Sequence, residues 1–194
     1  GFLVGGNPNE LVEAFNKTDA RELTLISNDT GTTETALYAL TQSGRIKRIY
    51  ASYIGANPET GRLLMTGEAE VVLVPQGTLA EKIRAGGAGL GGFLTPVGVG
   101  TVVEEGKTRM TLHGKDYLLE EPLRGQMALI RAHVADESGN LVIRGSSKNF
   151  NVVMATAADY VVAQVDEIVP VGSLDPECIT IPGIYVDALV KVGA

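Results

Sequence analysis

The sequence AEVVLVPQGTLAEKIRAGG, residues 69–87, passes directly from a strand pattern into a helix pattern. Residues 69–77 form a nearly continuous apolar run broken at Pro75, which is typical of a strand buried in a parallel sheet. Residues 78–87 have helical spacing and end in glycine. A strand, a turn and a helix in this order are the repeating unit of α/β proteins.

The helix of this unit carries its own start and stop signals. We predict that Thr78 caps its first turn, that Glu81 completes a capping box, and that Gly86 ends it.

The same alternation continues on both sides, with turn residues between the segments. It predicts strands at 22–27, 45–55, 127–136, 140–145 and 160–169, and helices at 8–17, 34–44, 150–159 and 184–190. Residues 100–123 have short alternating segments with glycine turns, which favour antiparallel hairpins. We therefore predict a single α/β domain over residues 1–194: three layers, α/β/α, with a mostly parallel sheet and a β-rich insert.

Composition narrows the function. The 194 residues are 44% apolar and carry a formal charge of -7, so the chain has no basic footprint for nucleic acid or for an anionic membrane. No apolar run approaches the ~20 residues that span a bilayer. The single cysteine, Cys178, has no partner for an internal disulfide, which favours a cytoplasmic location.

Residues 87–92, GAGLGG, have the spacing G-x-G-x-x-G that dinucleotide-binding proteins use. That motif needs a strand leading into the first glycine and a helix opening at the third. Here the glycines follow a predicted helix, and Pro96 disfavours a helix after them. We therefore expect a tight turn that lets backbone pack closely, and no nicotinamide or flavin site.

Gln76 is the candidate catalytic residue. It follows the apolar strand, and ligands in open α/β sheets bind beyond the carboxyl ends of the strands. A neutral amide with two N–H donors can stabilise an oxyanion without adding charge. The alternative, left open by the residues alone, is a turn residue that satisfies local backbone groups.

A second candidate is the segment GFLVGG, residues 1–6, a glycine-flanked apolar turn just ahead of a helix. Such a turn suits anion binding or close backbone approach, although an ordinary turn between strand and helix has the same pattern. The carboxylates of EEG at 104–106 resemble a nucleophile before a glycine, but a solvated hairpin end explains them. His113 and His133 have no second His or Cys at ligand spacing, so we expect no metal site.

Several segments together resemble the alpha subunit of family I coenzyme A-transferases of the acetate and 3-oxoacid type, and the resemblance covers nearly the whole chain. They are the initial GF with its glycine turn, LTLISNDTG, IGANPETGR, VVLVPQGTLAEKIRAGGAGLGGFLTPVGVGTVVEEGK, KNFN and LDPECITIPGIYVDALV. That family usually has a helix and a strand ahead of its Gly-Gly-Phe turn. We therefore expect residues of a first strand, leading into Gly1, to be missing from this sequence.

The resemblance implies a CoA-transferase or sugar-phosphate isomerase-like fold and the transfer of CoA from acetyl-, butyryl- or acetoacetyl-CoA to a short-chain carboxylic acid. It implies a glutamate nucleophile, which becomes a glutamyl-CoA thioester, on a beta subunit within a heterotetramer of two alpha and two beta subunits. CoA is then a substrate, and no tightly bound cofactor is expected. The alternative is a small-molecule-binding or isomerase-like domain of the same fold.

In this chain the resemblance assigns oxyanion stabilisation to Gln76. It assigns CoA binding to the six-residue turn Gly1, Phe2, Leu3, Val4, Gly5 and Gly6.

Overall fold

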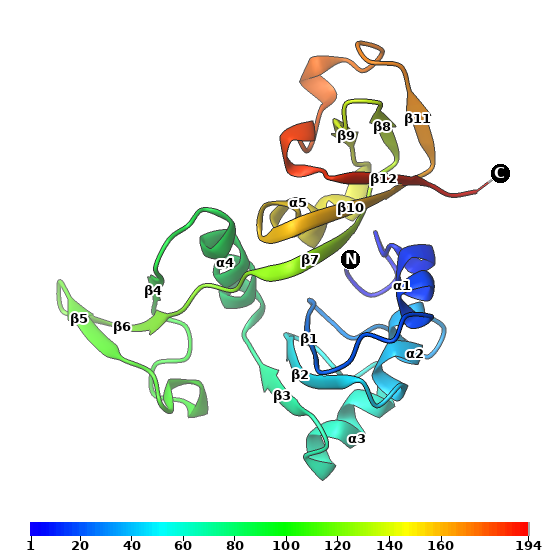
Figure 1. The fold of residues 1–194 in the computed structure, drawn as a ribbon. Helices are drawn as coiled ribbons and strands as arrows, with labels where there is room; N and C mark the ends of the chain where they lie inside the picture. The colour runs from blue at the N-terminus through cyan, green and yellow to red at the C-terminus, as the bar shows by residue number, and fades with distance from the viewer. Residues whose placement is uncertain (194) are drawn as a thin grey trace.

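The structure is a computed structural model that describes residues 1–193. Its N-terminal half contains a parallel sheet with the strand order β1-β2-β3 (Figure 1). The strands are β1 (Leu23–Ile26), β2 (Ile46–Ala51) and β3 (Glu70–Leu73). The helices are α1 (Asn9–Asn16), α2 (Ala36–Gln42), α3 (Pro58–Thr66), α4 (Gln76–Gly87) and α5 (Lys148–Thr156).

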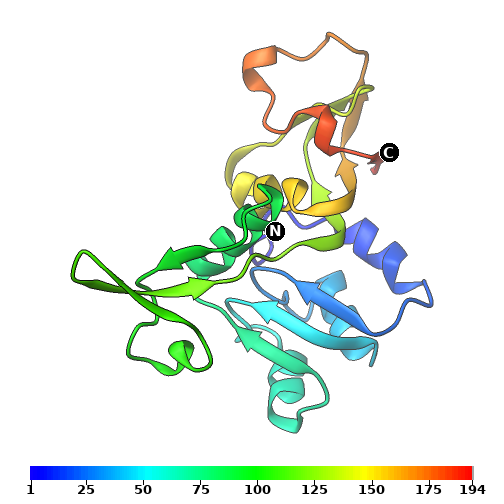
Figure 2. The ribbon, with the colours of Figure 1, turned by 60° about the vertical axis from the view of Figure 1, so that its left-hand side comes forward.

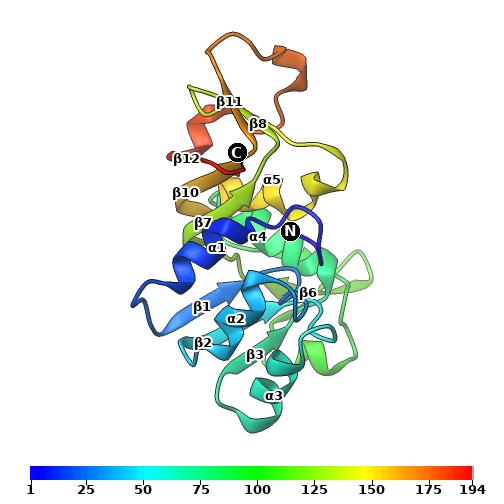
Figure 3. The same ribbon diagram turned by 90° about the vertical axis from the view of Figure 1, so that its right-hand side faces the viewer.

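The alternation of side chains along the strands places helices on both faces of this sheet. On one face Ile49 packs with Leu40 of α2 and Leu63 of α3. On the other face the neighbouring Tyr50 packs in the cluster that contains Ile83 of α4 and residues of α5. Helices α1, α2 and α3 accordingly lie together on one side in Figure 3, and the three-layer arrangement is that of an α/β/α domain.

A second parallel sheet has the order β12-β10-β7, formed by β7 (Gly125–Arg131), β10 (Ala158–Val165) and β12 (Ala188–Lys191). A small mixed sheet continues from it, with β8 (Val134–Asp136), β9 (Leu141–Val142) and β11 (Glu167–Val169). Both sheets pack with α5 around one core that includes Ile130, Leu141 and Val165.

The β-rich insert forms an antiparallel arm that projects from the body (Figure 2). It consists of β4 (Phe93–Thr95), β5 (Arg109–Leu112) and β6 (Lys115–Glu120). At its base Glu120 is only 1% exposed and accepts hydrogen bonds from Lys82 of α4 at 2.9 Å and Lys107 at 2.5 Å. The buried carboxylate therefore ties the arm to α4.

The predicted α/β class, the parallel pairing and the antiparallel insert are confirmed, although the parallel strands are divided among three sheets. The predicted terminal helix at 184–190 is wrong: a short 3-10 turn at Gly183–Tyr185 precedes β12. The β-branched Val186 and Val190 favour an extended backbone once β10 offers a strand edge.

The predicted start of α4 is also wrong. The helix begins at Gln76 with Pro75 at the N-cap, so Thr78 lies within its first turn. Thr78 is 3% exposed, and its hydroxyl has no hydrogen-bond partner among the described residues. Since the fixed φ of Pro75 sets the helix entry, no capping side chain is required.

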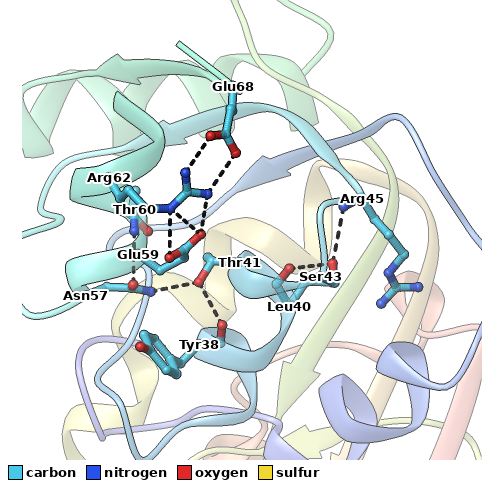
Figure 4. Close-up of polar contacts among 10 residues, drawn as sticks. All are labelled: Tyr38, Leu40, Thr41, Ser43, Arg45, Asn57, Glu59, Thr60, Arg62 and Glu68. Atoms are coloured by element: carbon cyan, nitrogen blue, oxygen red, sulfur yellow. Dashed lines mark hydrogen bonds and ion pairs between the residues drawn. The ribbon is translucent and has the colours of Figure 1, made fainter. Parts of the chain in front are cut away.

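Helix α3 was not predicted from the sequence, and it is fixed by a buried amide. Asn57 caps it by accepting the Thr60 N–H at 3.1 Å, while its own Nδ2 donates to the Thr30 carbonyl at 2.7 Å and to the Thr41 hydroxyl at 3.3 Å. Figure 4 shows this cap beside the ion pairs that Arg62 forms with carboxylates near both ends of the helix. Asn57 thus joins α2, α3 and the segment that follows β1.

The glycines at the end of α4 permit close packing. A Cβ atom on Gly86 would lie 2.0 Å from the Leu123 carbonyl oxygen, and one on Gly87 would lie 2.3 Å from the Thr156 hydroxyl oxygen. The helix runs through Gly87, and the glycines that follow lead into strand β4. The strand-to-helix context of a dinucleotide motif is therefore absent from this segment.

Candidate functional site

The residues that follow β1, β2 and β3 meet at the carboxyl edge of the first sheet. Asn28 and Asp29 follow β1, Ser52 follows β2, and Gln76 opens α4 after β3. The Asn28 carbonyl accepts the backbone N–H groups of Ser52 at 2.8 Å and of Tyr53 at 3.1 Å, which locks the first two strand ends together. This edge is where parallel α/β sheets bind ligands.

Gln76 is held by a buried amide. Its Nε2 donates to Oδ1 of Asn28 at 2.8 Å, and Asn28 is only 1% exposed. Gln76 itself is exposed, and its second N–H and its carbonyl oxygen form no hydrogen bond within residues 1–193, so both are available to a ligand.

A carboxylate continues the chain of hydrogen bonds toward the N-terminal turn. Asn28 Nδ2 donates to Oδ2 of Asp29 at 2.9 Å, and the same oxygen accepts the Leu3 N–H at 2.8 Å. The other oxygen, Oδ1, accepts the Gly31 N–H at 3.0 Å. Both oxygens of Asp29 therefore accept hydrogen bonds, and the carboxylate connects the end of β1 to the N-terminal turn.

The first six residues form a tight, strained turn. Phe2 and Gly5 exchange two backbone hydrogen bonds of 2.9 Å, and Leu3 has φ of 48°, which is left-handed. Gly6 has φ of 73°, and a Cβ atom there would lie 2.7 Å from Nδ2 of Asn151. The predicted turn is confirmed. Asn7 follows it and donates its amide N–H to the Leu3 carbonyl, and Pro8 is the N-cap of α1.

Amides from α5 hold the other side of this turn. Asn149 Nδ2 donates to the Gly5 carbonyl at 3.2 Å, and Asn151 Nδ2 donates to the Gly6 carbonyl at 2.9 Å. The two candidates of the sequence, Gln76 and the turn of residues 1–6, are thus brought together through Asn28 and Asp29. Sequence reasoning treated this Asn-Asp pair as turn chemistry; its place after a strand, like that of Gln76, was the available signal.

The other titratable candidates lie elsewhere. Glu104 accepts hydrogen bonds from the Gly100 N–H at 2.6 Å and from Arg109 at 3.2 Å, and both contacts hold its pKa below the ordinary value. His113 lies in the turn between β5 and β6. Within residues 1–193 no group of three or more His, Cys, Asp or Glu side chains could hold a metal ion.

A cavity of about 550 Å³ lies beside the N-terminal turn. Strand β1 lines one side and strand β7 the other, with residues of α1 and Gly1 at its margin. In the described part of the chain β1 pairs only with β2, and β7 pairs only with β10. The cavity therefore separates two unpaired strand edges.

Fold and site together define an α/β protein with neutral amide donors at the carboxyl edge of a parallel sheet. The model of the family "Coenzyme A transferase" matches residues 1–192, and the chain belongs to that family.

Two curated relatives are alpha subunits. The chain is 54% identical to the acetate CoA-transferase subunit alpha of Escherichia coli K12, over 98% of this chain and 86% of that protein. It is 44% identical to the acetoacetyl-CoA:acetate/butyrate CoA transferase alpha subunit of Clostridium acetobutylicum, over 98% of this chain and 88% of that protein. The chain is thus an alpha-type subunit of a CoA-transferase.

Solved structures share the fold at lower identity. An acyl-CoA transferase of Escherichia coli O157:H7 matches with a TM-score of 0.87 and 23% identity, over 97% of this chain and 42% of that one. The AibA/AibB decarboxylase matches with a TM-score of 0.82 and 24% identity, over 99% of this chain and 74% of that one. Since a decarboxylase has the same fold, the assignment to CoA-transferases rests on sequence similarity. None of the helices within residues 1–193 has the length and apolarity needed to cross a membrane.

Proposed function

We propose that this chain is the alpha subunit of a two-subunit CoA-transferase that moves CoA from an acyl-CoA to a short-chain carboxylic acid through a glutamyl-CoA thioester on a beta subunit. The observation that carries the proposal is the hydrogen-bond chain from Gln76 through Asn28 and Asp29 to the Leu3 N–H. It connects Gln76, an N–H donor that can stabilise an oxyanion, to the turn of residues 1–6, which can bind CoA.

The chemistry assigns Gln76 a role at the thioester carbonyl. When the partner's glutamate attacks, the C=O π electrons move to oxygen, and the outward N–H of Gln76 donates to that oxyanion. Collapse expels CoA thiolate and leaves an acyl-glutamyl anhydride; the thiolate then attacks the glutamyl carbonyl, releases the first carboxylate and forms glutamyl-CoA. The acceptor acid reverses both steps. One such donor contributes about 3–4 kcal/mol to the transition state.

The turn of residues 1–6 is proposed to bind CoA by close backbone approach. Its carbonyls at Gly5 and Gly6 are already occupied by the amides of α5, which fixes the turn before ligand arrives. A pre-formed turn lowers the ordering cost of binding.

The substrates we propose are acetyl-, butyryl- or acetoacetyl-CoA, with a short-chain carboxylic acid as acceptor. Support comes from the relatives' names, which mention acetate, acetoacetyl-CoA and butyrate. The single cysteine supports a cytoplasmic location.

We propose assembly with a beta subunit into a heterotetramer of two alpha and two beta subunits. The arm supports an assembled state, because its apolar side chains are exposed in the isolated chain. They are Val97, Val102, Met110, Leu112 and Leu119.

We also propose that residues 1–194 belong to one domain whose first strand precedes Gly1 and lies in the 550 Å³ cavity. The two unpaired edges of β1 and β7 support this, since a strand between them would satisfy both edges. A chain extended by that strand should protect the amides of β1 and β7 from hydrogen exchange; unchanged exchange would contradict the arrangement.

Expression alone and with the beta subunit tests the function. We expect CoA exchange between acyl-CoA and acetate only from the pair, and borohydride reduction in the presence of acyl-CoA should modify a glutamate of the beta subunit. Turnover by this chain alone, or modification of this chain, would refute the division of labour.

A further inference from the structure

A small polar pocket where β7 and β10 end has no role in the site described above. It encloses about 170 Å³ and is lined by Arg131, Ala132, His133, Ile143, Arg144, Ser147 and Asp166. We propose that this pocket binds a phosphate group of the acyl-CoA, an inference that rests on the proposed function of the neighbouring turn.

One carboxylate organises the floor of the pocket. Asp166 Oδ1 accepts a hydrogen bond from Arg131 Nη2 at 2.6 Å, and Asp166 Oδ2 lies 3.0 Å from Nδ1 of His133. Both carboxylate oxygens are therefore engaged, and the guanidinium of Arg131 is held in place with 31% of its side chain exposed. Its remaining N–H donors are available to a ligand.

The second guanidinium has no such partner. Arg144 is exposed, and its side chain forms no ion pair and no hydrogen bond with any residue in 1–193. The pocket is thus lined by two arginines and one aspartate, in a chain whose net charge is -7. Two planar forks of N–H donors match the oxygens of a phosphate.

Ser147 also lines the pocket. Its backbone carbonyl is bonded by Asn151, but its hydroxyl donates to no acceptor among the described residues. It can supply a further donor to a phosphate oxygen beside the two arginines.

A buried amide connects this pocket to the N-terminal turn. Asn151 is 1% exposed, and its Oδ1 accepts the backbone N–H of Arg131 at 3.1 Å. Its Nδ2 donates to the carbonyl oxygens of Gly6 at 2.9 Å and Ser147 at 2.8 Å. A Cβ atom on Gly6 would lie 3.0 Å from the Cα of Ser147, so turn and rim are in contact.

This order of contacts matches the ligand. CoA carries its thiol at one end and its phosphates toward the other. The hydrogen bonds run from Gln76 to the turn, and from the turn through Asn151 to the pocket. A ligand with its thioester at Gln76 and a phosphate in the pocket would therefore pass over the turn.

The test uses the alpha chain purified in complex with its beta subunit, and calorimetry with CoA, 3′-dephospho-CoA and pantetheine. R144Q should weaken CoA binding about tenfold, as expected for one charge-assisted hydrogen bond, and leave pantetheine binding unchanged. R144K, which keeps the charge but loses the fork, should recover part of the affinity. The charge-matched control K17Q removes an exposed cation just after α1 and should bind CoA like the wild type.

The two shortened ligands identify the phosphate. A penalty of R144Q that disappears with 3′-dephospho-CoA assigns the pocket to the 3′-phosphate, and one that persists assigns it to the pyrophosphate; either result supports the proposal. CoA affinity of R144Q equal to that of K17Q, or an equal loss for pantetheine, would overturn it. S147A provides a second variant if R144Q does not fold.

The same experiment distinguishes failure of the pocket from failure of the proposed function. If the wild-type complex binds CoA more tightly than R144Q but transfers no CoA, the pocket stands and the transferase function is refuted. If R144Q transfers CoA normally with an unchanged KM for acyl-CoA, the transferase function stands and the pocket is refuted.

Discussion

Replacing Asn28 by Ala tests whether the buried amide orients Gln76 for catalysis. The change removes the acceptor that holds Gln76 Nε2 at 2.8 Å and leaves the side chain free to rotate. Ordering a glutamine side chain costs about 1.5–2 kcal/mol, and 1.36 kcal/mol corresponds to tenfold in rate. We therefore expect kcat of the assembled enzyme to fall roughly 10- to 30-fold in N28A.

The double variant separates positioning from general damage. Q76A should lower kcat by about a hundredfold or more, through loss of the oxyanion donor. If Asn28 acts through Gln76, N28A/Q76A should be no slower than Q76A. A further tenfold loss in the double variant would refute the positioning role.

N57A is the matched control. Asn57 is also an amide that is 1% exposed, but its contacts are with α2, α3 and the Thr30 carbonyl rather than with Gln76. Both variants should lower Tm, because each leaves buried groups without partners. Only N28A should lower kcat per folded complex; an equal loss in N57A would show that kcat reports stability alone.

Three further changes test the fold and the turn. G86V should prevent folding or lower Tm strongly, because its Cβ would lie 2.0 Å from the Leu123 carbonyl oxygen. G91A, whose Cβ would have no atom within 4 Å, should have the Tm of the wild type. Similar Tm values for the two variants in thermal unfolding would contradict the close packing. Burial raises the pKa of Glu120, but hydrogen bonds from two lysines outweigh it and hold that pKa below its ordinary value. E120Q should therefore lose about 3–5 kcal/mol at pH 7, and denaturant titrations should show the difference from wild type shrinking as pH falls through the carboxylate's folded pKa. L3P, which loses the N–H donated to Asp29 and cannot adopt φ of 48°, should raise KM for acyl-CoA, whereas L3G should not.

Much of the fold could be predicted because local patterns agree with tertiary contacts. The apolar run ending at Pro75 is a strand followed by a helix, and the glycines at the end of α4 are where the backbone packs closely. The terminal segment was mistaken for a helix because its apolar spacing is compatible with both periods, and only the edge of β10 selects the strand. Such pairing is not contained in a local pattern.

The contacts between polar residues of the site likewise could not be predicted from local sequence patterns. Gln76 was identified by its place after a strand, but its partner Asn28 is 48 positions earlier in the chain and was seen only as a turn residue. Asn151, which joins the turn to the polar pocket, lies 145 positions from Gly6. Single-sequence reasoning finds donors one at a time, whereas their connection depends on which strand ends become neighbours.

The charge at this site gives a physical reason for the proposal that another subunit supplies the nucleophile. Asp29, the carboxylate at the sheet edge, accepts three hydrogen bonds, from Asn28, Leu3 and Gly31, and holds two segments together. Were it also the nucleophile, acylation would remove those acceptors and loosen the turn during the reaction. A cation in place of Gln76 would stabilise the attacking carboxylate before reaction as well as the oxyanion after it, and so lower the barrier less. A neutral amide fixed from behind favours the oxyanion selectively, provided that the attacking carboxylate arrives from outside this chain.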